Sequence, residues 1–236
     1  MTLHLLPADD AGNMRGALVV DLQPGWKTYW IAPGPVGLAP ELRFDGSQGL
    51  GPVTVDYPVP TRFIEGSETS VGFDAPTAFA LRSTSTSKTP PVMQVDFLLG
   101  LCREICVPLQ GHLDAHPDEG LSARAAVTAA FAALPDVAPA PSPVSARLSA
   151  NGREITVTTG IFGTDDPAAT VYVAGPPGWT FGLPVQRPDP TGTAAIAFTV
   201  PVERHPEPMP QSLSVDLLLT SGQTAQLSRS LAVSLP

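Results

Sequence analysis

The chain is organised around one stretch, Pro91-Val-Met-Gln-Val-Asp-Phe-Leu-Leu-Gly-Leu-Cys-Arg-Glu-Ile-Cys-Val-Pro-Leu-Gln-Gly-His-Leu113. Residues 91–101 alternate between apolar and polar side chains, which is typical of a β-strand with one buried face. Residues 106–113 form a second run of strand length. The three residues between Cys102 and Cys106 then make a tight turn. The sequence therefore predicts a β-hairpin that carries both cysteines of the chain at its end.

Short strands also precede this hairpin. The chain contains 28 Pro and 21 Gly, which are poor in helix interiors, so its composition favours strands and turns. Candidate strands span residues 14–22, 41–44, 53–57 and 77–81. Residues 58–73 are predicted to be a loop, although it contains two large apolar residues, Phe63 and Ile64, that need a surface to pack against. The aromatic segment 26–30 is predicted to anchor a β-sandwich core, or alternatively to line a protein-binding site.

One helix is predicted, over residues 121–134, because alanine has the highest helix propensity. Ser122 is expected to cap it and Pro135 to end it. The side chains expected to share its apolar face are Leu121, Ala125, Thr128, Phe131 and Leu134. Residues 135–143 contain four prolines, which indicates a semi-rigid linker.

The region after the linker is predicted to be entirely β. Candidate strands span residues 145–150, 153–159, 169–174, 193–200, 212–220 and 223–233. Turn signals separate them, and Asn151-Gly152 between two alternating segments predicts a hairpin. Strands at this spacing suggest a second β-sandwich of about 90 residues. This region offers no cysteine and no cluster of reactive side chains.

Charge and composition exclude several classes of function. The net charge is −9 with only 13 Lys and Arg, so a nucleic-acid surface is not expected. The sequence contains no run of 18 apolar residues, so a transmembrane helix is not expected. The first ten residues lack the features of a signal peptide, so we expect either a cytosolic protein or a mature or excised piece. No phosphate loop, HExxH motif or nucleophile elbow supports a nucleotide enzyme or an ordinary hydrolase.

The cysteine pair is the one dense site of reactive chemistry. Cys102 and Cys106 are close enough in a tight turn to form a disulfide. So short a loop removes little entropy from the unfolded chain, which weakens a purely structural role. Short, strained disulfides are more easily reduced, which suits thiol–disulfide exchange. A passive disulfide, or two buried thiols, remains the structural alternative.

Metal binding is the competing chemistry. Cys102, Cys106, His112 and His116 supply four nitrogen and sulfur donors for a possible zinc site, although the middle spacing is short for a zinc finger. Copper(I) held by the two thiolates is a further alternative, because soft ligands select it. The leading prediction includes no metal and no cofactor.

A set of motifs then occurs in a fixed order. They are Pro24-Gly-Trp-Lys-Thr-Tyr-Trp30, Pro33-Gly34, Gly37-Leu38, Tyr57-Pro-Val-Pro-Thr-Arg-Phe63, Thr69-Ser-Val-Gly-Phe73 and Cys102-Arg-Glu-Ile-Cys-Val-Pro108. Over residues 12–115 the chain resembles the N-terminal periplasmic domain of the DsbD-type thiol:disulfide interchange proteins. It is most similar to the subgroup of suppressor-of-copper-sensitivity protein B (ScsB).

The resemblance implies a redox-active cysteine pair on an immunoglobulin-like sandwich. Such a domain receives electrons from a membrane-embedded reductase domain, through a thioredoxin-like domain, and passes them to periplasmic thioredoxin-fold partners. Cys106 would form the mixed disulfide and Cys102 would release it. A cap loop over residues 62–73 would shield the pair. The cap and partner-binding residues implied are Arg62, Phe63, Ile64, Glu65, Glu68 and Phe73, together with Tyr29 beside the pair.

We therefore predict an all-β protein with two immunoglobulin-like sandwich domains. Residues 1–118 form the DsbD-like domain, residues 119–143 the helix and linker, and residues 144–236 the second sandwich. The predicted function is periplasmic thiol–disulfide exchange, as a protein-disulfide reductase in a copper-stress or disulfide-isomerase pathway. The chain is expected to be an excised ectodomain or a free-standing relative, and its periplasmic location rests on the resemblance. The alternative is a copper(I)-binding or passive structural β-sandwich.

Overall fold

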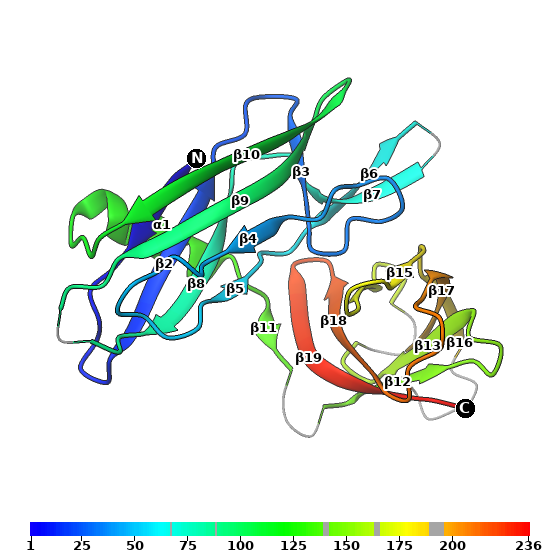
Figure 1. Ribbon diagram of the computed structural model, residues 1–236. Coiled ribbons are helices and arrows are strands. Elements are labelled where there is room, and N and C mark those ends of the chain that lie inside the picture. Colours follow the sequence, from blue (N-terminus) through cyan, green and yellow to red (C-terminus); the bar gives the residue numbers. More distant parts are fainter. Residues whose placement is uncertain (67, 88, 139–141, 163–165, 189–195) are drawn as a thin grey trace. The chain divides into compact units, whose positions relative to one another are not determined.

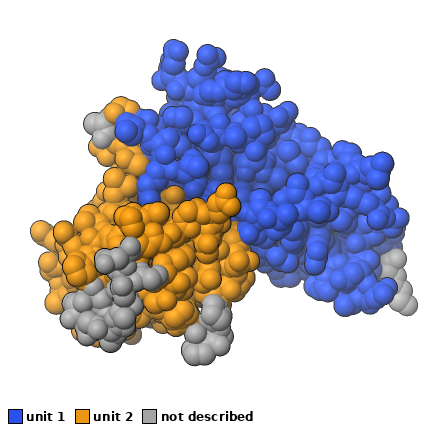
Figure 2. Space-filling model, turned by 180° about the vertical axis from the view of Figure 1, so that it is seen from behind, with its two compact units in different colours: residues 1–33, 37–65, 70–134 blue, residues 34–36, 66–69, 135–236 orange. Residues whose placement is uncertain are grey.

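The computed structural model describes residues 1–66, 68–87, 89–138, 142–162, 166–188 and 196–236. The chain divides into two compact units (Figure 2). Unit 1 contains residues 1–33, 37–65 and 70–134, and unit 2 contains residues 34–36, 66–69 and 135–236. Within the described ranges, no helix is long and apolar enough to cross a membrane.

Two antiparallel sheets form the first half of the chain (Figure 1). One sheet has the order β1–β2–β8–β5, with β1 Thr2–Leu5, β2 Asn13–Val20, β8 Thr77–Thr84 and β5 Thr54–Asp56. The other has the order β10–β9–β3–β7–β6, and β4 also pairs with β9. Its strands are β3 Lys27–Tyr29, β4 Glu41–Arg43, β6 Thr61–Glu65, β7 Glu68–Phe73, β9 Met93–Cys102 and β10 Cys106–Ala115.

Alternation along the strands builds the core of unit 1. Met93, Val95 and Leu99 lie on one face of β9 and are fully buried, as the period of two in a strand requires. Phe79 of β8 is fully buried, and its ring lies 5.8 Å from that of Phe73 on β7, so this aromatic pair joins the two sheets. The predicted β9–β10 hairpin is confirmed, with Cys102 and Cys106 directly opposite each other.

Helix α1, Leu121–Ala132, covers the outer face of the first sheet. Its buried side chains are Ala123, Val127 and Ala130, and the last two pack with Ala17 of β2 and Ala80 of β8. The predicted apolar face is therefore wrong for Leu121, Ala125 and Thr128, which are exposed, whereas Phe131 and Leu134 are partly buried and pack against this cluster. Small alanines on both elements allow close approach, whereas Leu121 at the first turn is exposed. The prediction that Ser122 caps the helix is also wrong. Gly120 occupies the N-cap position, and no side-chain hydrogen bond caps the helix there.

Unit 2 contains one nine-stranded sheet with the order β14–β18–β19–β12–β13–β17–β15, with β11 also paired to β19 and β16 to β17. The bounds are β11 Asp136–Val137, β12 Val144–Leu148, β13 Glu154–Thr159, β14 Thr170–Ala174, β15 Thr180–Phe181, β16 Val185–Pro188, β17 Ile196–Arg204, β18 Leu213–Ser221 and β19 Thr224–Ser234. Its core is a cluster of aliphatic side chains with Phe162, Phe198 and Trp179.

The prediction of an all-β protein is confirmed. The Asn151-Gly152 hairpin forms between β12 and β13, where Leu148 lies opposite Ile155. The strand predicted over 193–200 corresponds to β17, and its residues 193–195 lie outside the described residues. Residues 139–141 of the predicted linker also lie outside them.

Candidate redox site

The site is built on the β9–β10 hairpin, where Cys102 and Cys106 form a disulfide with their Cα atoms 4.1 Å apart. Cys102 ends β9 in the interior of the sheet and is only 1% exposed. Cys106 begins β10, the last strand of its sheet, and is exposed. Cys106 is therefore the more exposed residue of the pair.

Tyr29 lies against both sulfur atoms. In the β3–β9 pairing Lys27 is opposite Cys102, so Tyr29, two residues further along β3, leaves the sheet on the same face as the cysteines. Its hydroxyl oxygen lies 2.6 Å from Sγ of Cys102 and 3.3 Å from Sγ of Cys106. The residue is buried, so this hydroxyl meets the disulfide away from bulk water.

Glu65 holds the other side of this hydroxyl. The Tyr29 hydroxyl donates to the Glu65 carboxylate at 3.0 and 3.1 Å, and the Ser70 hydroxyl donates to Glu65 Oε2 at 2.5 Å. Burial raises the pKa of Tyr29 above its usual value, and the hydrogen bond to Glu65 and the charge of Glu65 raise it further. Tyr29 therefore keeps its proton and remains a hydrogen-bond donor beside the disulfide.

Two glycines make room for the Tyr29 ring. A Cβ on Gly37 would lie 2.8 Å from Cδ1 of the ring, and a Cβ on Gly100 would lie 2.8 Å from Cδ2 and Cε2. The carbonyl of Gly100 also accepts a hydrogen bond from the buried Thr28 hydroxyl at 2.9 Å. These glycines position the tyrosine, although the sequence marks them only as parts of longer motifs.

A cation and an aromatic ring stand next to the tyrosine. The Lys27 ammonium lies 4.5 Å from the centre of the Phe63 ring, and that ring centre is 6.2 Å from the ring of Tyr29. Sequence reasoning assigned a role to Phe63 but missed Lys27, because only the pairing of β3 with β9 places Lys27 opposite Cys102.

The predicted cap loop is wrong in its secondary structure. Residues 62–73 belong mainly to strands β6 and β7, which lie side by side at the end of the sheet, with residue 67 outside the described residues. Pairing of β7 with β3 imposes an extended conformation on a segment whose polar, glycine-containing sequence predicts a loop. We call residues 61–73 the β6–β7 segment below.

The structure brings together only some of the predicted cap residues. Phe63 and Glu65 are two residues apart on β6, so their side chains lie on the same face, and both contact Tyr29. Arg62 and Ile64 occupy the alternate positions, and Ile64 is 75% exposed. Glu68 is also exposed.

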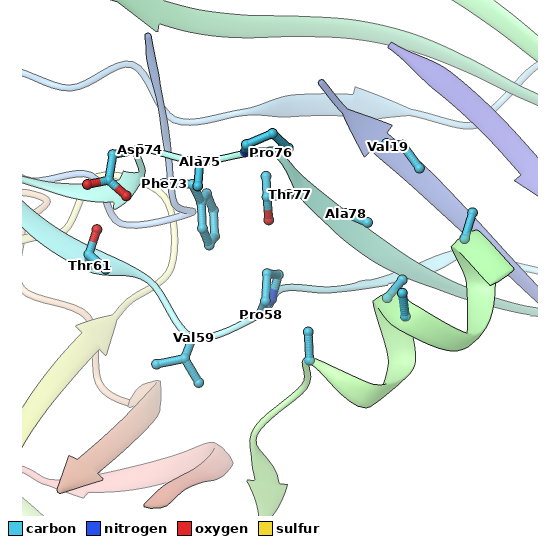
Figure 3. A pocket seen from close by; sticks show the side chains of 14 residues that line it. Val19, Pro58, Val59, Thr61, Phe73, Asp74, Ala75, Pro76, Thr77 and Ala78 are labelled. Carbon is cyan, nitrogen blue, oxygen red and sulfur yellow. The ribbon is translucent and has the colours of Figure 1, made fainter. Parts of the chain in front are cut away.

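Phe73 is separated from the cysteine pair and lines a pocket instead. This pocket has a volume of about 540 Å³ and lies between α1, the start of β8 and residues 58–61 (Figure 3). Its walls are mainly apolar side chains such as Val59, Phe73 and Ala130, and among the described residues that line it none carries a thiol, an imidazole or an amine. The polar side chains in its lining are those of Thr61, Asp74 and Thr77.

The zinc site with histidine ligands is not formed. His112 lies six residues beyond Cys106 along β10, about 20 Å at the rise of a strand, and its Nδ1 pairs with Asp96 at 2.7 Å. The donor atoms that do come together are a carboxylate oxygen of Glu65 and the sulfurs of Cys102 and Cys106, all within 4.8 Å of one another.

Comparison with known proteins finds a family-model match for the first half of the chain and a structure of similar fold. Residues 4–118 match the family model described as "Thiol:disulfide interchange protein DsbD, N-terminal". The N-terminal periplasmic domain of ScsB from Proteus mirabilis superimposes with a TM-score of 0.73 at 20% identity, covering 98% of this chain and 94% of that one. The predicted family resemblance and the immunoglobulin-like fold class are confirmed.

The remaining comparisons add no argument. The C-terminal domain of the Streptococcus pyogenes antigen I/II-family protein AspA covers 99% of both chains, but at 8% identity and a TM-score of 0.17. No curated protein sequence matches the chain.

Proposed function

Because residues 4–118 match the family model described as "Thiol:disulfide interchange protein DsbD, N-terminal", we propose that this chain is a protein-disulfide reductase module of the periplasm. It passes reducing equivalents from a membrane-embedded reductase domain, through a thioredoxin-like donor, to thioredoxin-fold acceptors. Its pathway is copper-stress protection or disulfide isomerisation. The observation that carries the proposal is a disulfide between an exposed and a buried cysteine, in contact with the hydroxyl of a buried tyrosine.

Exchange proceeds in two displacement steps. In the reduced chain the Cys106 thiolate attacks one sulfur of the acceptor's disulfide, which forms a mixed disulfide and releases the acceptor's other thiolate. The Cys102 thiolate then attacks Sγ of Cys106, which restores the Cys102–Cys106 disulfide and releases the acceptor's second thiolate. Two electrons pass to the acceptor, and a donor dithiol returns the chain to the reduced state by the reverse steps.

Tyr29 and Glu65 support the step in which Cys102 carries charge. When a donor thiolate attacks Cys106, the electron pair of the broken bond goes to Sγ of Cys102, which is buried. A buried thiolate needs a hydrogen-bond donor, and the Tyr29 hydroxyl at 2.6 Å is positioned to donate to it. The hydroxyl then exchanges its Glu65 acceptor for the thiolate, and the Ser70 hydroxyl continues to donate to Glu65.

The surroundings of the pair support selective exchange. Phe63 and the Lys27 ammonium lie next to Tyr29, and the β6–β7 segment that carries Phe63 ends the sheet. A partner must present its sulfur to the exposed side of Cys106, where the turn residue Ile105 is 75% exposed and apolar. We propose that this restriction limits exchange to thioredoxin-fold partners.

Trapping the mixed disulfide tests the proposal. In Cys102→Ser the exposed Cys106 keeps its thiol but nothing releases the intermediate. A thioredoxin-fold acceptor should therefore accumulate as a covalent adduct that is visible on a non-reducing gel and lost on reduction. The matched control is Cys106→Ser, in which the only thiol is the buried Cys102, and we expect adduct formation at least about tenfold slower.

Two results together would refute the function. They are the absence of an adduct between Cys102→Ser and any thioredoxin-fold acceptor, and the failure of every thioredoxin-like dithiol donor to reduce the oxidised chain. Equal adduct yields from both serine variants would refute the assignment of Cys106 as the attacking sulfur.

A further inference from the structure

A third possible metal ligand, Glu65, lies beside the cysteine pair. One carboxylate oxygen of Glu65 and the two sulfurs lie within 4.8 Å of one another. Glu65 comes from β6, 37 residues before Cys102 in sequence, and the sheet order β10–β9–β3–β7–β6 brings it to the pair. From this juxtaposition we propose that the reduced chain binds one zinc ion through Cys102, Cys106 and Glu65, and that zinc thereby controls access to the dithiol.

The donor set favours zinc. Zn²⁺ is held in proteins by thiolate sulfur, imidazole nitrogen and carboxylate oxygen, and it accepts four ligands in a tetrahedral arrangement. Two thiolates and one carboxylate carry three negative charges, which more than offset the two positive charges of the ion, and they leave one position for water. Copper(I) prefers soft sulfur ligands and gains little from a carboxylate, so a site that depends on Glu65 is a zinc site.

The carboxylate is oriented as a metal ligand needs to be. Ligating carboxylates in metal sites usually accept further hydrogen bonds that fix their direction. Glu65 accepts hydrogen bonds from the hydroxyls of Tyr29 and Ser70. Ser70 is fully buried, so its hydroxyl is fixed in position and continues to restrict the carboxylate when the Tyr29 hydroxyl turns to the Cys102 thiolate.

The redox state of the pair decides whether the site exists. In the disulfide neither sulfur is a thiolate, so the oxidised chain lacks two of the three ligands. Reduction of the disulfide by a donor dithiol yields two thiols, and zinc then binds both as thiolates with the release of two protons. An acceptor disulfide removes two electrons from the zinc-bound pair, which restores the Cys102–Cys106 disulfide and frees the ion.

The regulatory part of this inference rests on the proposed function. A zinc-bound thiolate is a weaker nucleophile than a free one, and the exposed Cys106 would be occupied. Zinc would therefore slow electron transfer to acceptors, and the module would be most active where free zinc is scarce.

A zinc titration of the full chain tests the site. The chain is reduced with a phosphine, separated from it without oxygen, and titrated with Zn²⁺ against a chromophoric indicator. We expect one equivalent of zinc per reduced chain and none per oxidised chain. Calorimetry in buffers of different ionisation enthalpy should show about two protons released per zinc bound.

Two carboxylate variants separate the proposed site from a simple dithiol. Glu65→Gln should weaken zinc binding at least about tenfold. Glu104→Gln is the matched control, because Glu104 lies in the turn between the two cysteines but is not part of the three-donor cluster. Its zinc affinity should equal that of the natural chain, and circular dichroism of the oxidised variants checks that both fold.

The outcomes are decisive in both directions. No binding to the reduced chain, or an unchanged affinity in Glu65→Gln, would overturn the site, and so would a loss seen only in Glu104→Gln. Exchange with an acceptor is measured separately with a chelator present. Zinc binding without exchange would then refute the proposed function alone, and exchange without zinc binding would refute this inference alone.

Discussion

At the scale of single residues, Tyr29 connects the parts of the site. Its hydroxyl contacts both sulfurs and donates to Glu65, and its ring fits between Gly37 and Gly100. The same burial that places it there holds its pKa above the ordinary value for tyrosine. Tyr57, whose ring lies 4.7 Å from Phe79, also has its pKa raised by burial.

These two tyrosines predict an alkaline loss of stability. Above pH about 10 a tyrosine in the unfolded chain loses its proton, whereas the folded chain still retains the protons of Tyr29 and Tyr57. Deprotonation then favours the unfolded state, so the free energy of unfolding falls as pH rises from about 10 through the folded pKa values. The natural chain should therefore be less stable at pH about 11 than at pH about 8, with the loss concentrated above pH about 10, as measured by urea unfolding.

The double variant Tyr29→Phe/Tyr57→Phe is the comparison for this prediction. It should lose clearly less stability over the same pH range, although its stability near neutral pH is lower because Glu65 loses one donor, worth about 1 kcal/mol. Parallel pH profiles for the two chains would contradict the prediction.

At the scale of elements, the pairing of β7 with β3 controls the site. Gly72 lies opposite Tyr29 in this pairing, and a Cβ at Gly72 would stand only 2.0 Å from the carbonyl oxygen of Thr28. The obstacle is backbone, so no side-chain rotation can relieve it. Glycine at this position is therefore what allows the β6–β7 segment to bring Glu65 and Phe63 to the disulfide.

Gly72→Ala should separate β7 from β3. We expect a loss of about 2–3 kcal/mol of stability, in the range of overpacked cores, and faster reduction of the disulfide by dithiothreitol, because the β6–β7 segment moves away from Tyr29. Chemical denaturation and the rate of thiol release measure the two effects. Gly160→Ala is the control, since a Cβ there meets no atom within 4 Å, and it should change stability by less than about 0.5 kcal/mol. An unchanged reduction rate in Gly72→Ala would contradict the assigned role of this pairing.

At the scale of the whole molecule, the second unit has a core of its own. A cluster of buried side chains that includes Ile155, Phe198 and Leu217 lies entirely within residues 144–236. The disulfide, Tyr29 and Glu65 all lie in unit 1. Stability in unit 2 and chemistry in unit 1 should therefore respond to different substitutions.

Phe198→Ala tests this separation. Removing a fully buried ring from the core of unit 2 should destabilise that unit by about 3–5 kcal/mol, which the fluorescence of Trp179 in the same core can report. The rate at which dithiothreitol reduces the disulfide under native conditions should stay within about twofold of the natural chain. A reduction rate that changes in step with the loss of stability would show that unit 2 supports the site.

The sequence by itself determined the features that depend on near neighbours. The cysteine hairpin follows from two alternating runs joined by three residues, and the helix over 121–132 follows from its alanines. The motif order predicts a resemblance to the DsbD N-terminal domain over residues 12–115, and the model of that family matches residues 4–118. In these cases the interacting residues are close in sequence, or the pattern belongs to a whole family.

Only the tertiary structure decided which distant residues meet. The β6–β7 segment has the composition of a loop, and it becomes strand because β7 pairs with β3 at Gly72 and Phe73 and with β6 on its other side. Glu65 reaches Tyr29 across 36 residues, and Lys27 lies opposite Cys102 across 75, because the strand order and register bring them together. The same register separates His112 from the cysteines and leaves Glu65 as the third donor. Contacts of this kind depend on how whole strands pair, and local sequence preferences do not encode that choice.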